Sequence, residues 1–182
     1  MEKLSPQNIS SPQPGSDPEP ASPTTNYGDA EVQFGMGLKF ATDLGAAQNY
    51  GQAAEWYHKA AAQNHSLAQF NLGVMYARGQ GVARDAAQSA IWFGKAAQLG
   101  DAGAQFNLGD SYQRASFGQA PSEASESRIE AYKWYRLAAA QGYKDSDKAW
   151  ITLVLNMTRA DVTTGNQRVA AFEIGKSNAP QG

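Results

Sequence analysis

The stretch that decides the fold is SLAQFNLGVMYARGQGVARDAAQSAIWFGKAAQLG, residues 66–100. Its hexapeptide AQFNLG, from Ala68 to Gly73, recurs unchanged from Ala104 to Gly109, 36 positions later. Other residues align at the same step: Gln33 with Gln69 and Gln105, and Gly37 with Gly73 and Gly109. Self-similarity at a fixed step of this length is the signature of a repeat protein.

The second half of each unit carries an aromatic pair, and an alanine pair follows it. The aromatic pairs are Trp56-Tyr57, Trp92-Phe93 and Trp134-Tyr135, and the alanine pairs are Ala60-Ala61, Ala96-Ala97 and Ala138-Ala139. The last step is 42 residues instead of 36, so the third unit contains six extra residues.

Capping residues predict where the helices begin and end. A good N-cap precedes each tryptophan by seven residues, with a capping-box partner three residues further on: Asn49 with Gln52, Asp85 with Gln88, and Ser127 with Glu130. The second helix of each unit is therefore predicted to begin there and to end at Asn64, Gly100 and Gly142. The first helices are predicted to begin near Asp29, Ser66 and Asp101. They are predicted to end before the turn that contains Gly45 or the turn that contains Gly79 and Gly81. Each unit is thus a helix, a turn and an antiparallel helix.

Gly73 lies inside a predicted helix, where it costs roughly 1 kcal/mol relative to alanine. The cost is acceptable if the partner helix approaches so closely that a β-carbon would clash. The small pair Ala96-Ala97 is the expected facing surface.

Residues 66–100 resemble the Sel1-like repeat, a relative of the tetratricopeptide repeat with the pattern A-x-Q-x-x-L-G-x-x-Y-x-x-G-x-G-V-x-x-D followed by A-x-x-W-[YF]-x-x-A-A. The first unit matches more loosely, with Asp43 and Ala46 in place of Gly79 and Val82, and the third replaces the Gly-x-Gly turn with RASFGQAPSEASE. The resemblance spans residues 29–174. It implies a right-handed all-α solenoid of about three and a half repeats, acting without catalysis as a bacterial protein-binding scaffold.

The two ends of the chain differ from the repeats. Residues 1–27 hold six of the eight prolines and are predicted to be a disordered tether, and residues 175–182 a flexible tail. The repeat domain is then 28–174, with a fourth first helix at 145–156 that carries Trp150 in the leucine position. A final capping helix is expected with Thr158 and Asp161 as its capping pair and Val162, Val169 and Phe172 on one face.

Composition narrows the classes of function. The 182 residues carry a net charge of −2, with 42% hydrophobic and 18% charged residues, which favours neither nucleic acid nor an anionic membrane as a partner. There is no cysteine and no apolar run of the roughly 18–20 residues that span a bilayer. We expect a monomer that binds a protein or peptide, with no cofactor. Location stays open: cytoplasmic as written, or exported if a signal is missing from this chain.

No constellation of catalytic or metal-ligating residues is predicted. His58 and His65 are interpreted as solvated residues and not as zinc ligands, because no third ligand lies nearby. Glu123, Glu126 and Glu130 are interpreted as a solvated patch and as helix-start charges. The periodic aromatic residues are interpreted as core and not as a stacking platform for nucleic acid.

The candidate binding surface follows from helical geometry. With Ala68, Leu72 and Tyr76 as the buried stripe, an adjoining stripe is predicted to line the concave wall of the solenoid. Its candidate partner-binding residues are Lys39, Asn71, Met75, Arg78, Asn107, Ser111 and Arg114. The asparagines can pair with a peptide backbone and the cations with carboxylates. The alternative, that Asn71 and Asn107 only form local hydrogen bonds, is left open.

A second hypothesis has a different class of function. The chain would be an immunity or inhibitory partner of a bacterial toxin or enzyme, acting through an irregular third-unit loop at residues 115–126. Insertions in a regular scaffold often carry function.

Overall fold

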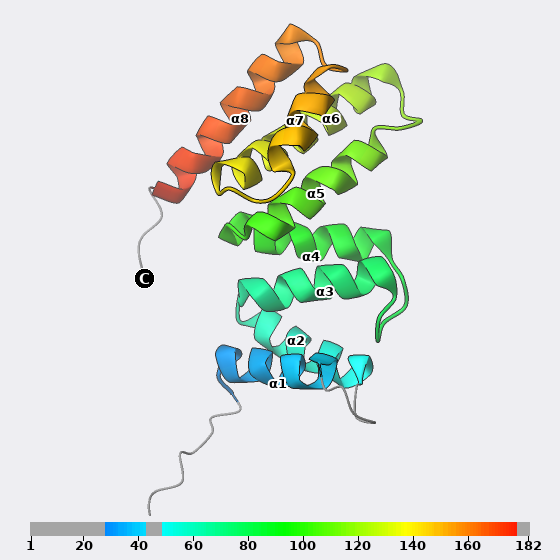
Figure 1. Cartoon of the computed structure of the whole chain (residues 1–182), viewed down its shortest axis with the longest axis vertical. Helices are drawn as coiled ribbons and strands as arrows, with labels where there is room; N and C mark the ends of the chain where they lie inside the picture. The colour runs from blue at the N-terminus through cyan, green and yellow to red at the C-terminus, as the bar shows by residue number, and fades with distance from the viewer. Residues whose placement is uncertain (1–27, 43–48, 178–182) are drawn as a thin grey trace, which may run out of the picture.

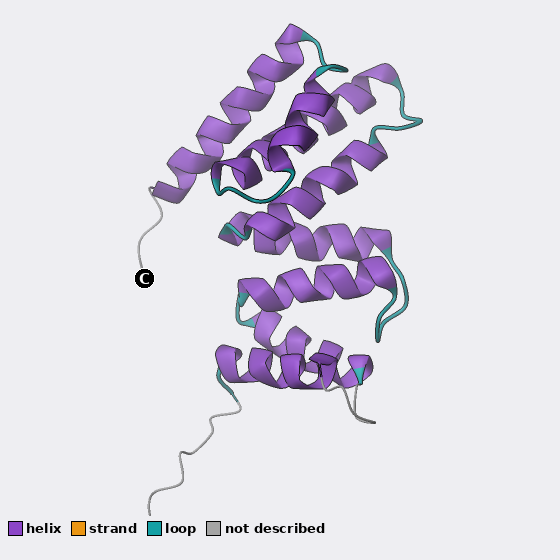
Figure 2. Cartoon of the chain, in the orientation of Figure 1, coloured by secondary structure: helices purple, strands orange, loops and turns teal. Residues whose placement is uncertain are grey.

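A computed structural model describes residues 28–42 and 49–177. In this part of the chain every regular element is an α-helix and no strand is present (Figure 2). The helices are α1 (Ala30–Thr42), α2 (Tyr50–Ala62), α3 (Ser66–Arg78), α4 (Ala86–Leu99), α5 (Ala102–Ala115), α6 (Pro121–Ala140), α7 (Ser146–Val154) and α8 (Arg159–Ser177). The predicted all-α class is confirmed. The predicted tether at 1–27, the turn with Gly45 and residues 178–182 lie outside the described residues.

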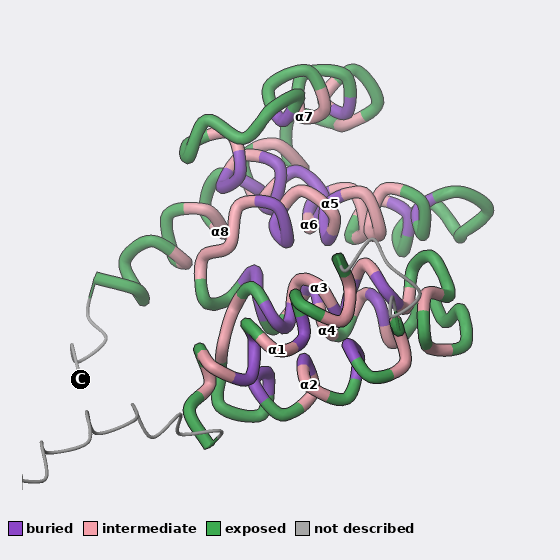
Figure 3. Tube along the Cα trace, turned by 60° about the horizontal axis from the view of Figure 1, so that its bottom comes forward, coloured by how far each residue is buried: buried purple, intermediate pink, exposed green. Residues whose placement is uncertain are grey.

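The helix pairs stack on one another along the long axis of the molecule. In Figure 1, α1 and α2 lie at the bottom, α3 and α4 above them, and α7 and α8 at the top. Buried residues lie on the helix faces that meet inside the stack, while the outer faces are exposed (Figure 3). α8 continues to Ser177, three residues beyond the predicted end of the domain.

The predicted caps of α2 and α4 are confirmed. The Asn49 side chain accepts a hydrogen bond from the Gln52 amide at 3.1 Å, and Asp85 accepts from the Gln88 amide at 3.0 Å. Asn64, Gly100 and Gly142 all have positive φ, at 61°, 100° and 72°. This left-handed conformation ends a helix at little cost when the residue is glycine or asparagine.

The start of α6 differs from the prediction. α6 begins at Pro121, so Ser127 lies inside the helix and does not cap it. Proline suits the first helical position because its φ is already helical and its missing N–H is not needed there. The six extra residues of the third unit therefore lengthen α6 to 20 residues, and only residues 116–120 of the predicted loop at 115–126 lie outside helices.

An aromatic ring packs against a glycine inside each helix pair. A β-carbon built on Gly73 would come within 2.6 Å of the Phe93 ring, and one built on Gly109 within 2.8 Å of the Tyr135 ring. Gly37 faces Tyr57 in the same way. The expectation of a close partner helix at Gly73 is confirmed, but the facing group is the aromatic ring and not the Ala96-Ala97 pair.

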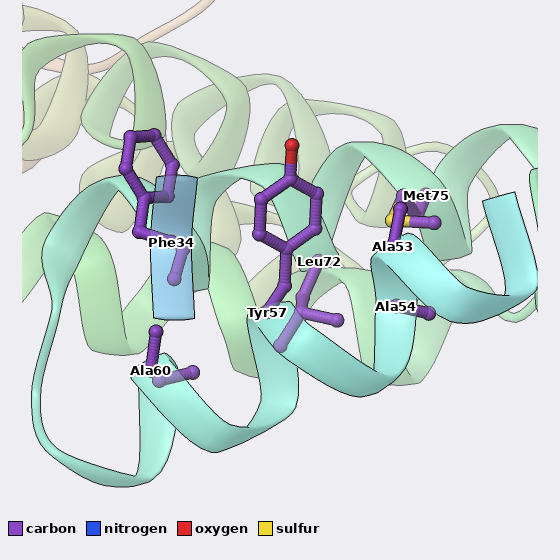
Figure 4. Close-up of a cluster of buried hydrophobic side chains, with 9 residues drawn as sticks. Phe34, Ala53, Ala54, Tyr57, Ala60, Leu72 and Met75 are labelled. Carbon is purple, nitrogen blue, oxygen red and sulfur yellow. The ribbon is translucent and has the colours of Figure 1, made fainter. Parts of the chain in front are cut away.

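The alanine pairs lie at the interface between units. Ala60 and Ala61 belong to one buried cluster with Ala68 and Leu72 of the next unit, part of which is drawn in Figure 4. Ala96 and Ala97 form the corresponding cluster with Ala104 and Leu108 of the third unit. Small side chains in α2 and α4 thus let the next first helix pack closely.

α8 covers the end of the stack as the sequence predicts. The Thr158 and Asp161 side chains accept hydrogen bonds from each other's amides at 3.1 and 2.9 Å, which is a reciprocal capping box. Val169 and Phe172 pack on the cluster that contains Trp134, and Val162 on the cluster that contains Tyr132.

Polar contacts also join α8 to α6. Arg168 donates to Glu126 and to Glu130, each at 2.6 Å, so the interpretation as a solvated charge is wrong for Glu130, whereas Glu126 stays exposed beside its ion pair. Glu123 is exposed in the first turn of α6, as a solvated helix-start charge should be. The hydrogen bond from Arg168 lowers the pKa of Glu126, although partial burial opposes it. The Ser125 hydroxyl donates to Asp161 at 2.6 Å, and this bond is the main cause of the lowered pKa of Asp161.

We expect Gly73→Ala to destabilise the chain by about 1–3 kcal/mol, because the added methyl group overlaps the Phe93 ring inside a packed interface. Gly35→Ala is the matched control. Among the described residues no heavy atom lies within 4 Å of its β-carbon, so the higher helix propensity of alanine should raise stability by up to about 1 kcal/mol. Urea unfolding followed by circular dichroism measures both. An equal change in the free energy of unfolding for the two variants would contradict the close packing of Phe93 on Gly73.

We expect acid to loosen α8 from α6. The folded-state pKa values of Glu126 and Asp161 are lowered, so their stabilising contribution is complete above about pH 4.5 and is lost as pH falls through the folded values. At pH 7, Arg168→Gln should cost about 0.5–1 kcal/mol, as expected for a partly exposed ion pair. The difference should shrink towards zero by about pH 3. Thermal unfolding of the wild type and of Arg168→Gln between pH 7 and about pH 3 measures this difference in stability. A difference that does not change with pH would contradict the prediction.

Candidate functional site

The structure separates the seven candidate residues into buried, half-buried and exposed positions. Lys39, Arg78 and Arg114 are exposed, and Asn71, Asn107 and Ser111 are half-buried. Met75 is only 5% exposed and lies in the first core cluster beside Ala53 and Ala54 of α2 (Figure 4). The prediction that Met75 lines the surface is wrong, because α3 is covered by α2 as well as by α4 and buries a wider arc.

The two asparagines already have local hydrogen bonds. Asn71 bonds to the hydroxyl of Tyr57, and Asn107 donates to the Gly103 carbonyl of its own helix at 2.8 Å. Burial raises the pKa of Tyr57, while the bond to Asn71 acts in the opposite direction. These local bonds are the ones that the alternative interpretation expects. A role for either amide in binding a partner stays a prediction.

Ser111 occupies a repeat position that is filled in the neighbouring units. Met75 precedes it by 36 residues, and Leu153 follows it by the 42 residues of the longer third unit. Both of these side chains are buried, at 5% and 3% exposed. The Ser111 side chain is much smaller, and its hydroxyl donates to the Asn107 carbonyl at 2.9 Å. The third unit therefore lacks the apolar group that fills this position in α3 and α7, and the first unit carries the exposed Lys39 there.

A groove lies where that group is missing. It consists of two adjoining hollows of about 390 and 550 Å³, which share Ala90, Ser111 and Ala115. We call it the α4–α5 groove. The first hollow is lined by Ala90, Ile91, Gly94, Gln98, Leu108, Ser111, Tyr112, Ala115 and Trp134, and the second by Ala77, Arg84, Ala86, Ala87, Ser89, Ala90, Ser111, Arg114 and Ala115.

The two halves of the groove differ in chemistry. Arg84 and Arg114 lie in one half, and both are exposed and form no ion pair with any residue that the structure describes. The other half is apolar, with an exposed Ile91 and the indole of Trp134. Burial is the main cause of a raised pKa of Tyr112 there, so its hydroxyl stays protonated at neutral pH. Such a groove can take an apolar side chain next to an acidic one.

Sequence reasoning found part of this groove. Ser111 and Arg114 line it, whereas Lys39, Asn71 and Arg78 line neither of its two hollows. It missed Arg84, Ile91 and Trp134, the last because the aromatic residues were assigned to the core. The signal that could have found the groove is a polar residue, Ser111, at the position of Met75 and Leu153.

The histidines pack within the helix stack, so their interpretation as solvated is wrong. The Nδ1 atom of His65 caps α3 by accepting from the Ala68 amide at 3.2 Å, and its ring stacks on Phe34. His58 packs edge-on against Trp92, and burial followed by the charge of Lys95 lowers its pKa. Within residues 28–42 and 49–177 no group of three acidic, histidine or cysteine side chains is placed to hold a metal ion.

The stacked helix pairs and the open groove define an α-helical repeat solenoid of the kind that presents a surface to other molecules. The model of the Sel1 repeat matches residues 30–65, 66–101 and 102–143, which together make up more than half of the chain. The protein therefore belongs to the Sel1 repeat family.

Two solved structures are similar to the chain. One is that of c5321, described as a protective antigen present in uropathogenic Escherichia coli strains displaying an SLR fold, with 29% identity and a TM-score of 0.68. The match covers 80% of this chain and 30% of that one. The other is a Sel1 repeat protein from Oxalobacter formigenes, with 30% identity and a TM-score of 0.59, covering 69% of this chain and 49% of that one. The chain thus spans less than half of either structure. None of the curated proteins matches it.

Family membership gives a general class of function. Sel1 repeats generally mediate interactions between proteins and generally form scaffolds without catalytic activity. None of the helices in the described ranges is both long and apolar enough to cross a membrane.

Proposed function

We propose that this chain is a non-enzymatic interaction module that holds an extended segment of a partner protein in the α4–α5 groove. An acidic side chain of the segment pairs with Arg84 and Arg114, and a neighbouring apolar side chain packs against Ile91 and Trp134. The observation that carries the proposal is the hollow at Ser111, next to two arginines that form no ion pair with any described residue. Family membership supports the general role.

Charge and geometry favour an acidic segment. Arginine forms bidentate hydrogen bonds with carboxylates, and two arginines along one groove would fix the direction in which the segment lies. The apolar half would bury a side chain of the partner, which supplies most of the affinity in such interfaces. The binding mechanism is additive contact along a preformed surface, with no covalent step.

We expect Ser111→Met to block this binding by filling the hollow as Met75 fills the equivalent space in the second unit. Peptides selected from a random display library on the wild-type chain should combine an acidic and an apolar residue. Their affinity should fall at least about tenfold for Ser111→Met and for Arg84→Glu with Arg114→Glu, measured by calorimetry. Gly35→Ala, on the exposed face of α1, should bind normally.

Thermal unfolding controls for folding, because Ser111→Met should keep or raise stability. If the selected peptides bind Ser111→Met as tightly as the wild type, the groove is not the site. Absence of any acidic preference among the peptides would contradict the role of the arginines.

A second candidate function uses the turn between α5 and α6. Phe117 is 74% exposed in the five residues 116–120 that remain outside the helices, and Gly118 follows it with φ at 81°. A large exposed apolar side chain on a tight turn suits insertion into a partner's pocket. This candidate function keeps the hypothesis of an immunity or inhibitory partner, but the contact segment is residues 116–120 and not the predicted loop at 115–126.

We expect Phe117→Ala to separate the two candidates. Binding to a toxin or enzyme encoded beside this protein should weaken at least about 30-fold, as for an anchor residue, if the turn inserts into that partner. The stability of the chain should not change, because the ring is exposed. Binding assays with the purified pair measure this, and unchanged affinity would exclude the turn as the contact.

A further inference from the structure

The repeated glutamine joins consecutive units. Gln69 and Gln105 are among the most buried side chains of the protein. Each donates its side-chain N–H to the last turn of the preceding second helix: Gln69 to the Ala61 carbonyl and Gln105 to the Ala97 carbonyl, both at 3.2 Å. Each glutamine also has a carboxamide oxygen, and burial requires a donor for it.

A second glutamine supplies that donor in the first and third units. Gln63 donates to Oε1 of Gln33 at 3.0 Å, and Gln141 donates to Oε1 of Gln105 at 2.9 Å. Gln63 and Gln141 occupy the same repeat position, the C-cap of α2 and of α6. The chain thus uses a paired carboxamide at this point in two of its three complete units.

The second unit lacks the donor. The residue in that position is Leu99, which cannot donate through its side chain and is 46% exposed. Oε1 of Gln69 is accordingly buried and has no hydrogen-bond partner among the described residues, although the side chain as a whole is only 2% exposed. Such an acceptor costs free energy unless a hydrogen-bond donor satisfies it.

A tryptophan with an unpaired donor lines the same hollow as Gln69. The indole Nε1 of Trp92 is buried and likewise has no partner within residues 28–42 and 49–177. Gln69, Trp92 and Leu99 line a hollow of about 390 Å³ between α2 and α4, with Lys95 over the Trp92 ring at 4.0 Å. We call it the α2–α4 pocket. Gln98 is the one lining residue that it shares with the α4–α5 groove.

We propose that the α2–α4 pocket binds the carboxamide side chain of a glutamine or asparagine from a partner protein. The carboxamide N–H donates to Oε1 of Gln69, and its carbonyl accepts from Nε1 of Trp92. The ligand takes the place of the glutamine that the second unit lacks. This site and its ligand are independent of the α4–α5 groove.

The other polar groups of proteins fit the pocket less well. A carboxylate only accepts, so it would leave Oε1 of Gln69 facing another oxygen. An ammonium group only donates, cannot pair with the indole N–H, and is repelled by Lys95. A carboxamide presents a donor and an acceptor on one edge and carries no charge. Entry requires side chains at the mouth to rotate, and Leu99 and Lys95 are both exposed.

The test titrates propionamide into the ¹⁵N-labelled full-length chain. We expect a saturable shift of one indole N–H resonance, with a dissociation constant in the millimolar range given the few atoms of the probe. Trp92→Phe identifies that resonance. Propionate and 2-butanone, which have a similar shape but no amide donor, should give no saturable shift at equal concentration. N-methylpropionamide should bind at least tenfold more weakly, because its methyl group replaces one N–H.

Leu99→Gln is the decisive variant. Its new carboxamide should donate to Gln69 as Gln63 and Gln141 do in their units, raise Tm by about 2–4 °C and weaken propionamide binding at least tenfold. Leu99→Met is the matched control, which restores no donor and should bind like the wild type. The proposal is overturned if the wild type shows no saturable response, if propionate, butanone or N-methylpropionamide binds equally, or if Leu99→Gln still binds.

Discussion

The contact between an aromatic ring and a helical glycine is the constraint on which the stack depends. Tyr57, Phe93 and Tyr135 each place a ring where the β-carbon of Gly37, Gly73 or Gly109 would otherwise lie. The two helices of a unit can therefore approach closely. This approach leaves the opposite face of the second helix, with its alanine pair, to receive the next unit. The glycine, the aromatic ring and the alanine pair recur together because each unit makes the same packing contacts with an equivalent neighbouring unit.

Residues that differ from their equivalents in the other units are not explained by the repeated packing contacts. A regular position is explained by packing, since its equivalents make the same contacts. Ser111 and Leu99 differ from their equivalents in opposite ways. The serine stands where α3 and α7 have a buried apolar group, and the leucine stands where the first and third units have the donor of a paired carboxamide. The first leaves space and the second leaves an unsatisfied acceptor. Each change leaves a surface that a second molecule can complete.

Sequence reasoning predicted the elements well and the surface poorly. Helix ends depend on local chemistry, so Asn49, Asp85 and Gly100 were assigned correctly. The start of α6 was missed because Ser127 and Glu130 have the spacing of a capping box inside a helix that Pro121 had already begun. The packing partner of Gly73 was misassigned because sequence gives the period of the contacts and not the direction in which a facing side chain points.

The error at Met75 has a geometric cause. Three residues along a helix turn it by about 300°, so Met75 lies only about 60° around the helix from the buried Leu72. On a helix covered by one neighbour such a position is a boundary, but α3 is covered by α2, α4 and α5. The buried arc therefore includes Met75, and the exposed face of a first helix is narrower than an amphipathic pattern suggests. In a stack of this kind, comparing equivalent positions of the units locates a binding surface better than the amphipathic pattern of one helix does. A residue that is smaller than its equivalents leaves a hollow, and one that is more apolar leaves a polar group of its neighbour without a partner.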